Sequence, residues 1–349
     1  MKPSMDKLSR SPLALAGLIT ASAVYAGRQV ARRRRRIDFA GKTVVISGGS
    51  RGLGLELARA FASEGANIAL LARDENNLQR GASQLQQFGS RVTPLVCDVG
   101  DHDQVKQTIA FILGQHQQIE VLVNNAGIIQ VGPLENMARE DYERSMRTHF
   151  WGPLNLMNEV IPAMQAASSG RIVNIASIGG RVAVPHLLPY VASKFALVGL
   201  SEGMRAELLK DGIFVTTVSP GLMRTGSHLN AFFKGQHKKE YALFALANAS
   251  PLLSTASLTA ARKILEACRY GAAEITITPQ AKLLRVAHGL FPSLVTNALG
   301  WVGRLLPEAA SQGMNVSKPG WKSKSSMAPA FLTRSADRAA HRNNEIAGE

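Results

Sequence analysis

Short apolar runs alternate with longer stretches of helical periodicity from residue 42 to about residue 280. The runs are rich in Val and Ile and mostly end at Gly, Asn, Asp or Ser, which is typical of buried strands. Between them, apolar residues recur three and four positions apart, as in amphipathic helices. This alternation predicts a parallel, doubly wound α/β sheet. The expected strands are residues 43–47, 67–72, 91–97, 121–123, 171–175, 214–218 and 274–278.

The first expected strand leads into a glycine-rich turn. Gly48, Gly52 and Gly54 follow Thr43–Ser47, and a segment with apolar residues at helical spacing comes next. Glycines let the backbone approach a pyrophosphate closely, and a helix N-terminus supplies N–H donors and the positive end of a dipole. The order strand, turn and helix therefore predicts a phosphate-binding site.

A hydroxyl, a phenol and an amine occur close together after the fifth expected strand. Ser177 follows that strand, and Tyr190 and Lys194 lie four residues apart on one face of a helix expected over 189–209. A neighbouring ammonium favours the phenolate and lowers the pKa of a tyrosine from about 10. The pair could then exchange a proton near neutral pH, while Ser177 holds the oxygen that receives it. Taken alone, such a pair is more often a solvated helix face.

The first 36 residues carry much of the charge. The chain has 349 residues and a formal net charge of +15, and residues 1–36 contain nine Lys and Arg against one Asp. Because this charge lies beside an apolar segment, it does not predict nucleic-acid binding. The two cysteines, Cys97 and Cys268, supply neither a disulfide framework nor a metal cluster, so no metal site is predicted.

That apolar segment is Leu13–Ala26, and five consecutive arginines follow it at 32–36. It is shorter than the roughly 20 residues that span a bilayer comfortably. An uncleaved anchor, a helix on the membrane surface, a cleaved signal peptide and a disordered basic tail are all open. The arginines argue against a cleaved signal peptide, because they would hold their side of the segment in the cytoplasm. We therefore favour membrane association through residues 12–36, with the body of the protein on the cytoplasmic side.

Four blocks together resemble the short-chain dehydrogenase/reductase family. The resemblance covers about residues 38–280 and implies one Rossmann-type domain of about seven strands. It further implies binding of NAD(P), transfer of hydride to or from a carbonyl or alcohol, and a homodimer or homotetramer. The blocks are Ser47-Gly48-x-x-x-Gly52-x-Gly54, Asn124-Asn125-Ala126-Gly127, Ser177 with Tyr190-x-x-x-Lys194, and Pro220-Gly221.

The resemblance also implies a role for each matching residue. Tyr190 would be the acid/base, Ser177 would hydrogen-bond the substrate oxygen, and Lys194 would hold the nicotinamide ribose and lower the pKa of Tyr190. Asp98 would contact the adenine, and Thr225 would meet the carboxamide end of the nicotinamide. The implied cofactor-binding residues are Ser47, Gly48, Ser50, Arg51, Gly52, Leu53, Gly54, Arg73, Asp98, Val99, Asn125, Ala126, Gly127, Tyr190, Lys194, Pro220, Gly221, Met223 and Thr225.

One position departs from the family pattern. His149 stands where the family usually has an asparagine that helps to hold a water molecule in a proton relay. A histidine can donate and accept hydrogen bonds too, but it ordinarily titrates near pH 6.5. We expect His149 to join Ser177, Tyr190 and Lys194 as a fourth catalytic residue and to give activity a near-neutral ionisation. The alternative is a histidine that only packs between helices.

The end of the second expected strand indicates which dinucleotide binds. An acidic residue there would bind the ribose 2′-OH of NAD. This chain has Ala72 and then Arg73, with Arg51 in the glycine turn and Asp74 as an expected helix N-cap. Guanidinium groups suit a 2′-phosphate, so the sequence predicts NADPH and, in a reducing cytosol, reduction of a carbonyl. The rival reading is a non-catalytic NADPH-binding sensor or scaffold at a membrane, which only the departure at His149 favours.

The later segments indicate the substrate and the domain limits. By the resemblance, residues 226–253 cover the substrate, and their apolar side chains predict a hydrophobic, lipid-like ketone or aldehyde. Residues 281–306 predict one or two amphipathic helices that either pack on the domain or lie on a membrane. From Ser317 onward the polar chain is expected to be largely disordered. The expected divisions are an N-terminal segment 1–36, a catalytic domain 37–280 and an extension 281–349.

Overall fold

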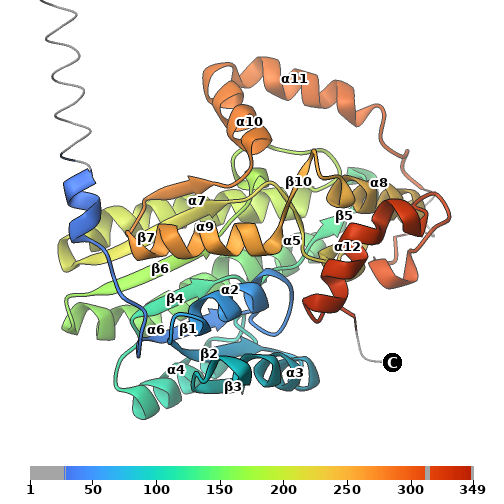
Figure 1. Cartoon of the computed structure of the whole chain (residues 1–349). Coiled ribbons are helices and arrows are strands. Elements are labelled where there is room, and N and C mark those ends of the chain that lie inside the picture. Colours follow the sequence, from blue (N-terminus) through green and yellow to red (C-terminus); the bar gives the residue numbers. More distant parts are fainter. Residues whose placement is uncertain (1–26, 28, 311–314, 347–349) are drawn as a thin grey trace, which may run out of the picture.

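A seven-stranded parallel sheet forms the centre of the protein, whose computed structural model describes residues 27, 29–310 and 315–346 (Figure 1). The predicted doubly wound α/β sheet is confirmed, with small shifts at the strand ends. From one edge to the other the strands are β11 (Glu274–Thr276), β7 (Ile213–Ser219), β6 (Gly170–Ile175), β4 (Val121–Asn124), β1 (Thr43–Ser47), β2 (Asn67–Ala72) and β3 (Val92–Val96).

Helices cover both faces of this sheet, which explains why its strands are continuous apolar runs. Successive side chains of a strand point to opposite faces. In β1, Val44 and Ile46 pack with the helices of one face and Val45 with those of the other. The first face carries α2 (Gly52–Ala62), α3 (Glu75–Leu85) and α9 (Ser257–Arg269), and the second carries α4 (His102–His116), α6 (Gly152–Ala166) and α7 (Leu188–Leu208). Helix α5 (Arg139–Met146) packs against α7.

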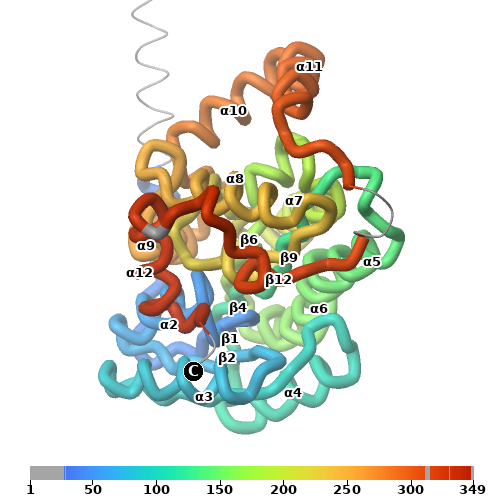
Figure 2. The backbone as a smooth tube through the Cα atoms, turned by 90° about the vertical axis from the view of Figure 1, so that its right-hand side faces the viewer, coloured from blue at the N-terminus to red at the C-terminus, as the bar shows by residue number. Residues whose placement is uncertain are grey.

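Two small sheets and a helix lie beyond the carboxyl ends of the central strands, because most of their segments follow β4 or β7 in the chain, and β12 comes from the C-terminal extension. One sheet pairs β8 with β10, and the other joins β5, β9 and β12. Figure 2 views the molecule from this side. The elements are β5 (Gln130–Val131), β8 (Leu222–Arg224), β9 (Phe232–Phe233), α8 (His237–Ala249), β10 (Ser254–Ala256) and β12 (Lys318–Pro319).

The segment from Ser317 to residue 346 is folded, so the expectation of a largely disordered tail is wrong for residues 317–346. Helix α12 (Ala330–Arg342) packs against α8 and buries Ala336 and Ala340 completely. The hydroxyl of Ser335 donates to the carbonyl of Ala249 at 2.9 Å. This segment folds despite its polar composition, because hydrogen bonds and small side chains hold the helix in place and a large apolar face is not needed.

Helices α10 (Pro279–Leu290) and α11 (Pro292–Gly303) form a hairpin that projects from the body (Figure 1). Ala281 is the one buried residue of α10, and α11 has none. The prediction of one or two helices is confirmed, with two present, and most of their apolar side chains are not packed on the domain. The predicted anchor, Leu13–Ala26, lies outside the described residues. Among the helices that the structure describes, none is both long and apolar enough to cross a bilayer.

Candidate active site

Helix α7 places Tyr190 and Lys194 one turn apart, as predicted. The Lys194 Nζ atom lies 5.8 Å from the centre of the Tyr190 ring and donates a hydrogen bond to the carbonyl of Ile175 at 2.8 Å. Lys194 is 4 % exposed. The end of β6 therefore fixes the amine beneath the phenol, and the pair is not a solvated helix face.

Ser177 comes off the end of β6 beside this pair. Its Oγ accepts the N–H of Gly179 at 3.0 Å and so begins a short 3₁₀ turn. A Cβ atom added to Gly179 would lie 3.4 Å from Tyr190 Cε1 and 3.5 Å from Ser177 Oγ. The phenol ring and the hydroxyl therefore border the same small space, where they could both meet one substrate oxygen.

The protonation of this pair differs from the expectation. Burial raises the pKa of Tyr190 above 10, with a hydrogen bond from Ser177 acting in the opposite direction. Burial lowers the pKa of Lys194 to about 7. The expected net lowering of the Tyr190 pKa is therefore not found in this structure. The amine is directed at the Ile175 carbonyl and is only partly charged at neutral pH, so loss of solvation dominates at the phenol.

His149 is held at both ring nitrogens. It lies in the π-helical turn η4 (Arg147–Trp151) and is 1 % exposed. Its Nε2 accepts the N–H of Ile128 at 3.1 Å, and its Nδ1 lies 2.7 Å from Ser193 Oγ. The Ser193 hydroxyl donates to the carbonyl of Tyr190 at 2.8 Å. Because Nε2 must be unprotonated to accept, the neutral ring carries its proton on Nδ1.

These contacts correct the predicted ionisation of His149. Burial, assisted by the charge of Lys194, lowers the pKa of His149 well below 6.5. A near-neutral ionisation of this ring is therefore not expected. The His149 and Tyr190 rings meet edge to face, with their centres 5.4 Å apart. The observed bonds tie the chain after β4 to the start of α7, which positions Tyr190, while a role in a proton relay stays a prediction.

The glycine turn depends on close backbone approach. A Cβ atom on Gly48 would lie 2.8 Å from Ala126 Cα, and one on Gly54 would collide with the carbonyl oxygen of Gly48. Gly52 has a φ of +59° and begins α2. Ser50 and Leu53 belong to the same turn and are buried. The turn thus brings the N-terminus of α2 to the carboxyl end of β1, which suits a phosphate group.

The segment Asn125 to Gly127 braces this turn. The Ser47 Oγ accepts the N–H groups of Asn125 and Ala126 at 3.0 and 3.2 Å. The side-chain amide of Asn125 donates to the carbonyls of Ser47 and Gly48. A Cβ atom on Gly127 would approach His149 Nε2 to 3.2 Å. The predicted motif residues of β1 and β4 are therefore brought together.

The residues predicted for the adenosine end follow the next two strands. Arg73 is exposed directly after β2, and Asp74 caps α3 as predicted. After β3, Val99 is buried, and Asp98 forms an ion pair with Arg147 at 3.2 Å. The carboxylate of Asp98 and the exposed guanidinium of Arg73 lie at neighbouring strand ends, which is compatible with an adenine and a ribose phosphate.

The residues predicted for the nicotinamide end follow β7. The carbonyl of Pro220 accepts the N–H of Ile178, which ties this turn to the Ser177 segment. A Cβ atom on Gly221 would lie 2.5 Å from Thr278 Oγ1. Met223 packs on the core of the α2 face and Thr225 is 4 % exposed. The Pro-Gly turn therefore closes the same region as Ser177.

Two sets of residues at this region were not predicted. Ser193 lies three residues after Tyr190 and links it to His149. This helical spacing could have indicated that Ser193 lies beside Tyr190. Asn343, Asn344 and Glu345 contact the glycine turn from the far end of the chain, with no local signal to indicate it.

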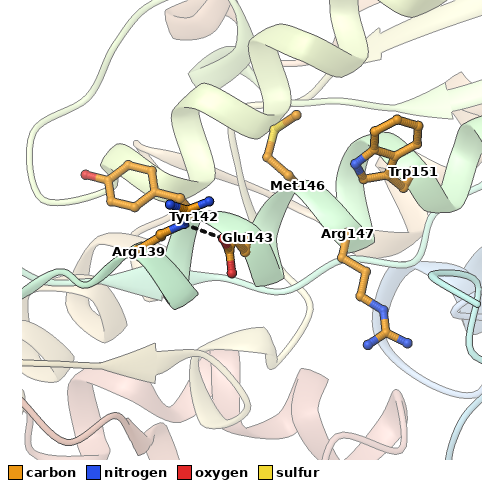
Figure 3. Close-up of a pocket in the computed structure, with 6 residues that line it drawn as sticks. All are labelled: Arg139, Tyr142, Glu143, Met146, Arg147 and Trp151. Carbon is orange, nitrogen blue, oxygen red and sulfur yellow. Dashed lines mark hydrogen bonds and ion pairs between the residues drawn. The ribbon is translucent and has the colours of Figure 1, made fainter.

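A separate hollow lies on the surface of α5 and η4. Figure 3 shows its six lining residues, with an ion pair between Arg139 and Glu143. Its lining residues are Arg139, Tyr142, Glu143, Met146, Arg147 and Trp151. None of them is among the predicted catalytic residues.

Comparison with known proteins gives a consistent result. Residues 42–232 match the family model of short chain dehydrogenases. The chain is 35 % identical over 225 residues to a dehydrogenase/reductase SDR family protein 7-like of Anopheles gambiae, covering 63 % of this chain and 70 % of the relative.

Two solved structures have a similar fold. A short-chain dehydrogenase from Streptomyces avermitilis has a TM-score of 0.66 and 26 % identity, covering 77 % of this chain and 99 % of the other. L-Sorbose reductase from Gluconobacter frateurii, complexed with NADPH and L-sorbose, has a TM-score of 0.62 and 26 % identity, covering 69 % and 97 %.

Proposed function

The chain belongs to the short-chain dehydrogenase family of NAD(P)-dependent oxidoreductases, and we propose that it uses NADPH to reduce a hydrophobic, lipid-like ketone or aldehyde to an alcohol. The arrangement of Ser177, Tyr190 and Lys194 at the end of β6 carries this proposal. The glycine turn fits the cofactor phosphates, because its backbone approaches closely and α2 begins there. When bound, NADPH supplies the hydride that the carbonyl carbon accepts.

The residues of the chain would supply the proton and the orientation. Ser177 would hold the carbonyl oxygen, and the Tyr190 hydroxyl would donate its proton as charge develops there. The raised pKa of Tyr190 keeps this hydroxyl protonated at neutral pH, which is the state that an acid needs for reduction. Lys194 would place a positive charge under the phenol when it is protonated and stabilise the phenolate that forms. His149 would hold the start of α7 in position through Ser193.

The preference for NADPH rests on two arginines. Arg73 follows β2 where NAD-specific sites have a carboxylate, and Arg51 lies in the glycine turn. Both guanidinium groups could pair with a 2′-phosphate. The similar L-sorbose reductase is a complex with NADPH, which supports the same preference here.

A hydrophobic substrate is supported by an apolar cluster beyond the strand ends. Val131, Phe233 and Tyr241 are buried together, and Leu187 from the loop before Tyr190 and Phe244 pack against them. This cluster therefore adjoins the loop that joins Ser177 to Tyr190. Apolar walls with a few polar groups are usual for sites that take small hydrophobic molecules.

We also propose that the protein lies on a membrane, with its body on the cytoplasmic side. The predicted contact through residues 12–36 is joined by the α10–α11 hairpin, since residues 277–307 contain no Asp or Glu but carry Lys282 and Arg304. Short helices with exposed apolar residues, tryptophan and cations suit a bilayer surface with anionic lipids. The exposed apolar side chains of the hairpin are Leu283, Val286, Leu290, Phe291, Leu294, Trp301 and Val302.

From the family we further propose a homodimer or homotetramer.

The membrane proposal is tested with the full chain on vesicles of phosphatidylcholine and phosphatidylserine with brominated acyl chains. A variant with Trp151→Phe and Trp321→Phe keeps only Trp301, whose fluorescence should be quenched by the bromine. The matched control, Trp301→Phe with Trp321→Phe, keeps only Trp151 and should not be quenched. Unquenched Trp301 would refute the contact through the hairpin.

The reductase proposal is tested by following NADPH absorbance with the full chain and a panel of carbonyls, from short ketones to long-chain keto lipids. We expect turnover that increases with the apolar size of the carbonyl and is lost in Tyr190→Phe. NADPH binding without turnover on any carbonyl would instead favour a non-catalytic sensor or scaffold.

A further inference from the structure

The last described residues cross the glycine turn. The carbonyl of Asn343 accepts the N–H of Gly52 at 2.8 Å, and the side-chain amide of Asn344 donates to the carbonyl of Ser50 at 2.9 Å. Figure 2 shows this end of the chain beside α2 and α3, close to the ends of β1 and β2. We name Asn343, Asn344 and Glu345 the C-terminal strap. Its contacts are made with the part of the turn that is predicted to bind the cofactor.

Glu345 brings a carboxylate to the N-terminus of α2. Its Oε1 lies 2.5 Å from the position that a Cβ atom on Gly52 would take, and its Oε2 lies 3.6 Å from Arg51 Nε. The second glycine of such a turn allows the pyrophosphate to approach the backbone. A helix N-terminus favours negative charge. The carboxylate therefore occupies the surroundings that suit a phosphate group, and it pairs with an arginine predicted to bind the 2′-phosphate.

The strap also reaches the segment after β7. The side-chain amide of Asn343 donates to the carbonyl of Thr225 at 3.2 Å, and that of Asn230 donates to Glu345 Oε2 at 2.6 Å. Thr225 is predicted to meet the nicotinamide end of the cofactor. The strap thus connects the glycine turn to the segment on the other side of the expected cofactor site.

The strap is held by polar contacts that water can replace. Arg342, just before it, forms an ion pair with Glu56 at 2.6 Å, and Arg80 donates to Asn344 Oδ1 at 3.0 Å. A hydrogen bond contributes little net stability when water can take the place of either partner. Residues 343–345 include no apolar side chain, so their release moves no apolar side chain of the strap into water. Displacement of the strap therefore does not require the domain to unfold.

We propose that the C-terminal strap is an autoinhibitory segment that competes with NADPH for the glycine turn. This inference rests on the proposed NADPH function. The strap uses the Gly52 N–H and the Arg51 guanidinium, and a dinucleotide that needs the same groups binds only when the strap is displaced. The observed dissociation constant then equals the intrinsic constant divided by the fraction of molecules with the strap released.

Two variants of the full chain test the competition by fluorescence titration with NADPH. Glu345→Ala should lower the dissociation constant about fivefold, because it removes the carboxylate but leaves the turn intact. Deletion of residues 343–349 should lower it at least as much. Deletion of residues 347–349 alone and Glu143→Ala, an exposed position on α5, are the controls and should leave the constant unchanged.

The outcomes separate this inference from the proposed function. An unchanged or weaker affinity in both strap variants, with turnover intact, would overturn the strap proposal alone. Absence of NADPH binding in every variant would overturn both proposals. Circular dichroism melting shows whether the deletion still folds.

A second measurement uses the unaltered chain and limited digestion with trypsin. Cleavage after Arg342, followed by mass spectrometry, should become several-fold faster when NADPH is added, because the cofactor displaces the strap. Slower cleavage with NADPH would show that strap and cofactor bind together, and would overturn the competition.

Discussion

The catalytic region and the C-terminal region are built from contacts of different range along the chain. Lys194 bonds to Ile175, 19 residues away, and Ser193 bonds to Tyr190, three residues away. Asn344, in contrast, bonds to Ser50, 294 residues away. A motif of fixed spacing can encode the first kind of contact because one strand, turn and helix bring its residues together. The second kind exists only once the whole sheet has formed, so a local pattern cannot indicate it.

Removal of the Tyr190 hydroxyl should distinguish the catalytic region from the C-terminal region most clearly, because it should affect turnover and leave cofactor binding almost unchanged. We expect Tyr190→Phe to lower turnover by about 10³-fold, because a positioned acid contributes roughly 10²–10⁴-fold. NADPH affinity should change less than about threefold, since the ring and the strap contacts remain. Turnover is measured by NADPH absorbance and affinity by fluorescence, with Tyr142→Phe on α5 as the matched control. Turnover within tenfold of the original would show that another group supplies the proton.

The sequence was sufficient for the sheet and for the placement of Ser177, Tyr190 and Lys194 beside one another. Continuous apolar runs such as residues 43–47 and 67–72 match β1 and β2, because strands covered on both faces have no polar side to interrupt them. Tyr190 and Lys194 come together through helical spacing alone. The end of a strand places Ser177 beside them. These arrangements follow from local geometry, which can be inferred from the apolar runs and from the spacing of residues in the sequence.

Protonation and the tail could not be predicted, because both depend on burial by distant parts of the chain. The pKa of Tyr190 is raised rather than lowered because the folded domain removes water from the phenol. His149 was expected to titrate, yet Ile128 and Ser193 occupy both of its nitrogens. The tail from Ser317 onward was expected to be disordered because its partners on α2 and α8 are far away in the sequence.

Removing Arg73 should test the cofactor specificity of the strand-end region. Arg73→Ala should raise the NADPH dissociation constant by roughly 10- to 100-fold, because a charge-assisted contact with the 2′-phosphate is lost. NADH affinity should not change, since NADH lacks that phosphate. Arg91→Ala, just before the amino end of β3, is the matched control for the loss of charge. Equal losses for NADPH and NADH would place Arg73 outside the 2′-phosphate site.

The pKa of Lys194 predicts a smaller, pH-dependent effect on cofactor binding. Because this pKa is about 7, Lys194 is mostly charged at pH 6 and mostly neutral at pH 8. A charged amine attracts the anionic dinucleotide, so we expect NADPH affinity to fall about fivefold from pH 6 to pH 8. The Lys194→Arg variant stays charged over this range, so its NADPH affinity should not fall between pH 6 and pH 8. Comparison with this variant also corrects for titration of the cofactor itself. The same fall in both proteins would assign it to another group.

Replacing His149 should have the smallest effect on chemistry, and it tests the position where the catalytic region departs from its motif. In His149→Asn we expect turnover within about fivefold of the original and an unaltered pH profile between pH 6 and 8, because the ring is neutral throughout that range. The free energy of unfolding should fall by about 1–3 kcal/mol, since the shorter side chain cannot bond both the Ile128 N–H and Ser193. Stability is measured by urea unfolding. Loss of a near-neutral ionisation in the variant would show that His149 titrates in the working enzyme, and that substrate or cofactor changes the surroundings that keep it neutral here. An unaltered pH profile with lower stability would show that His149 acts as a positioning residue at the place where the family usually has a relay residue. It would do so through tertiary contacts that no sequence motif describes.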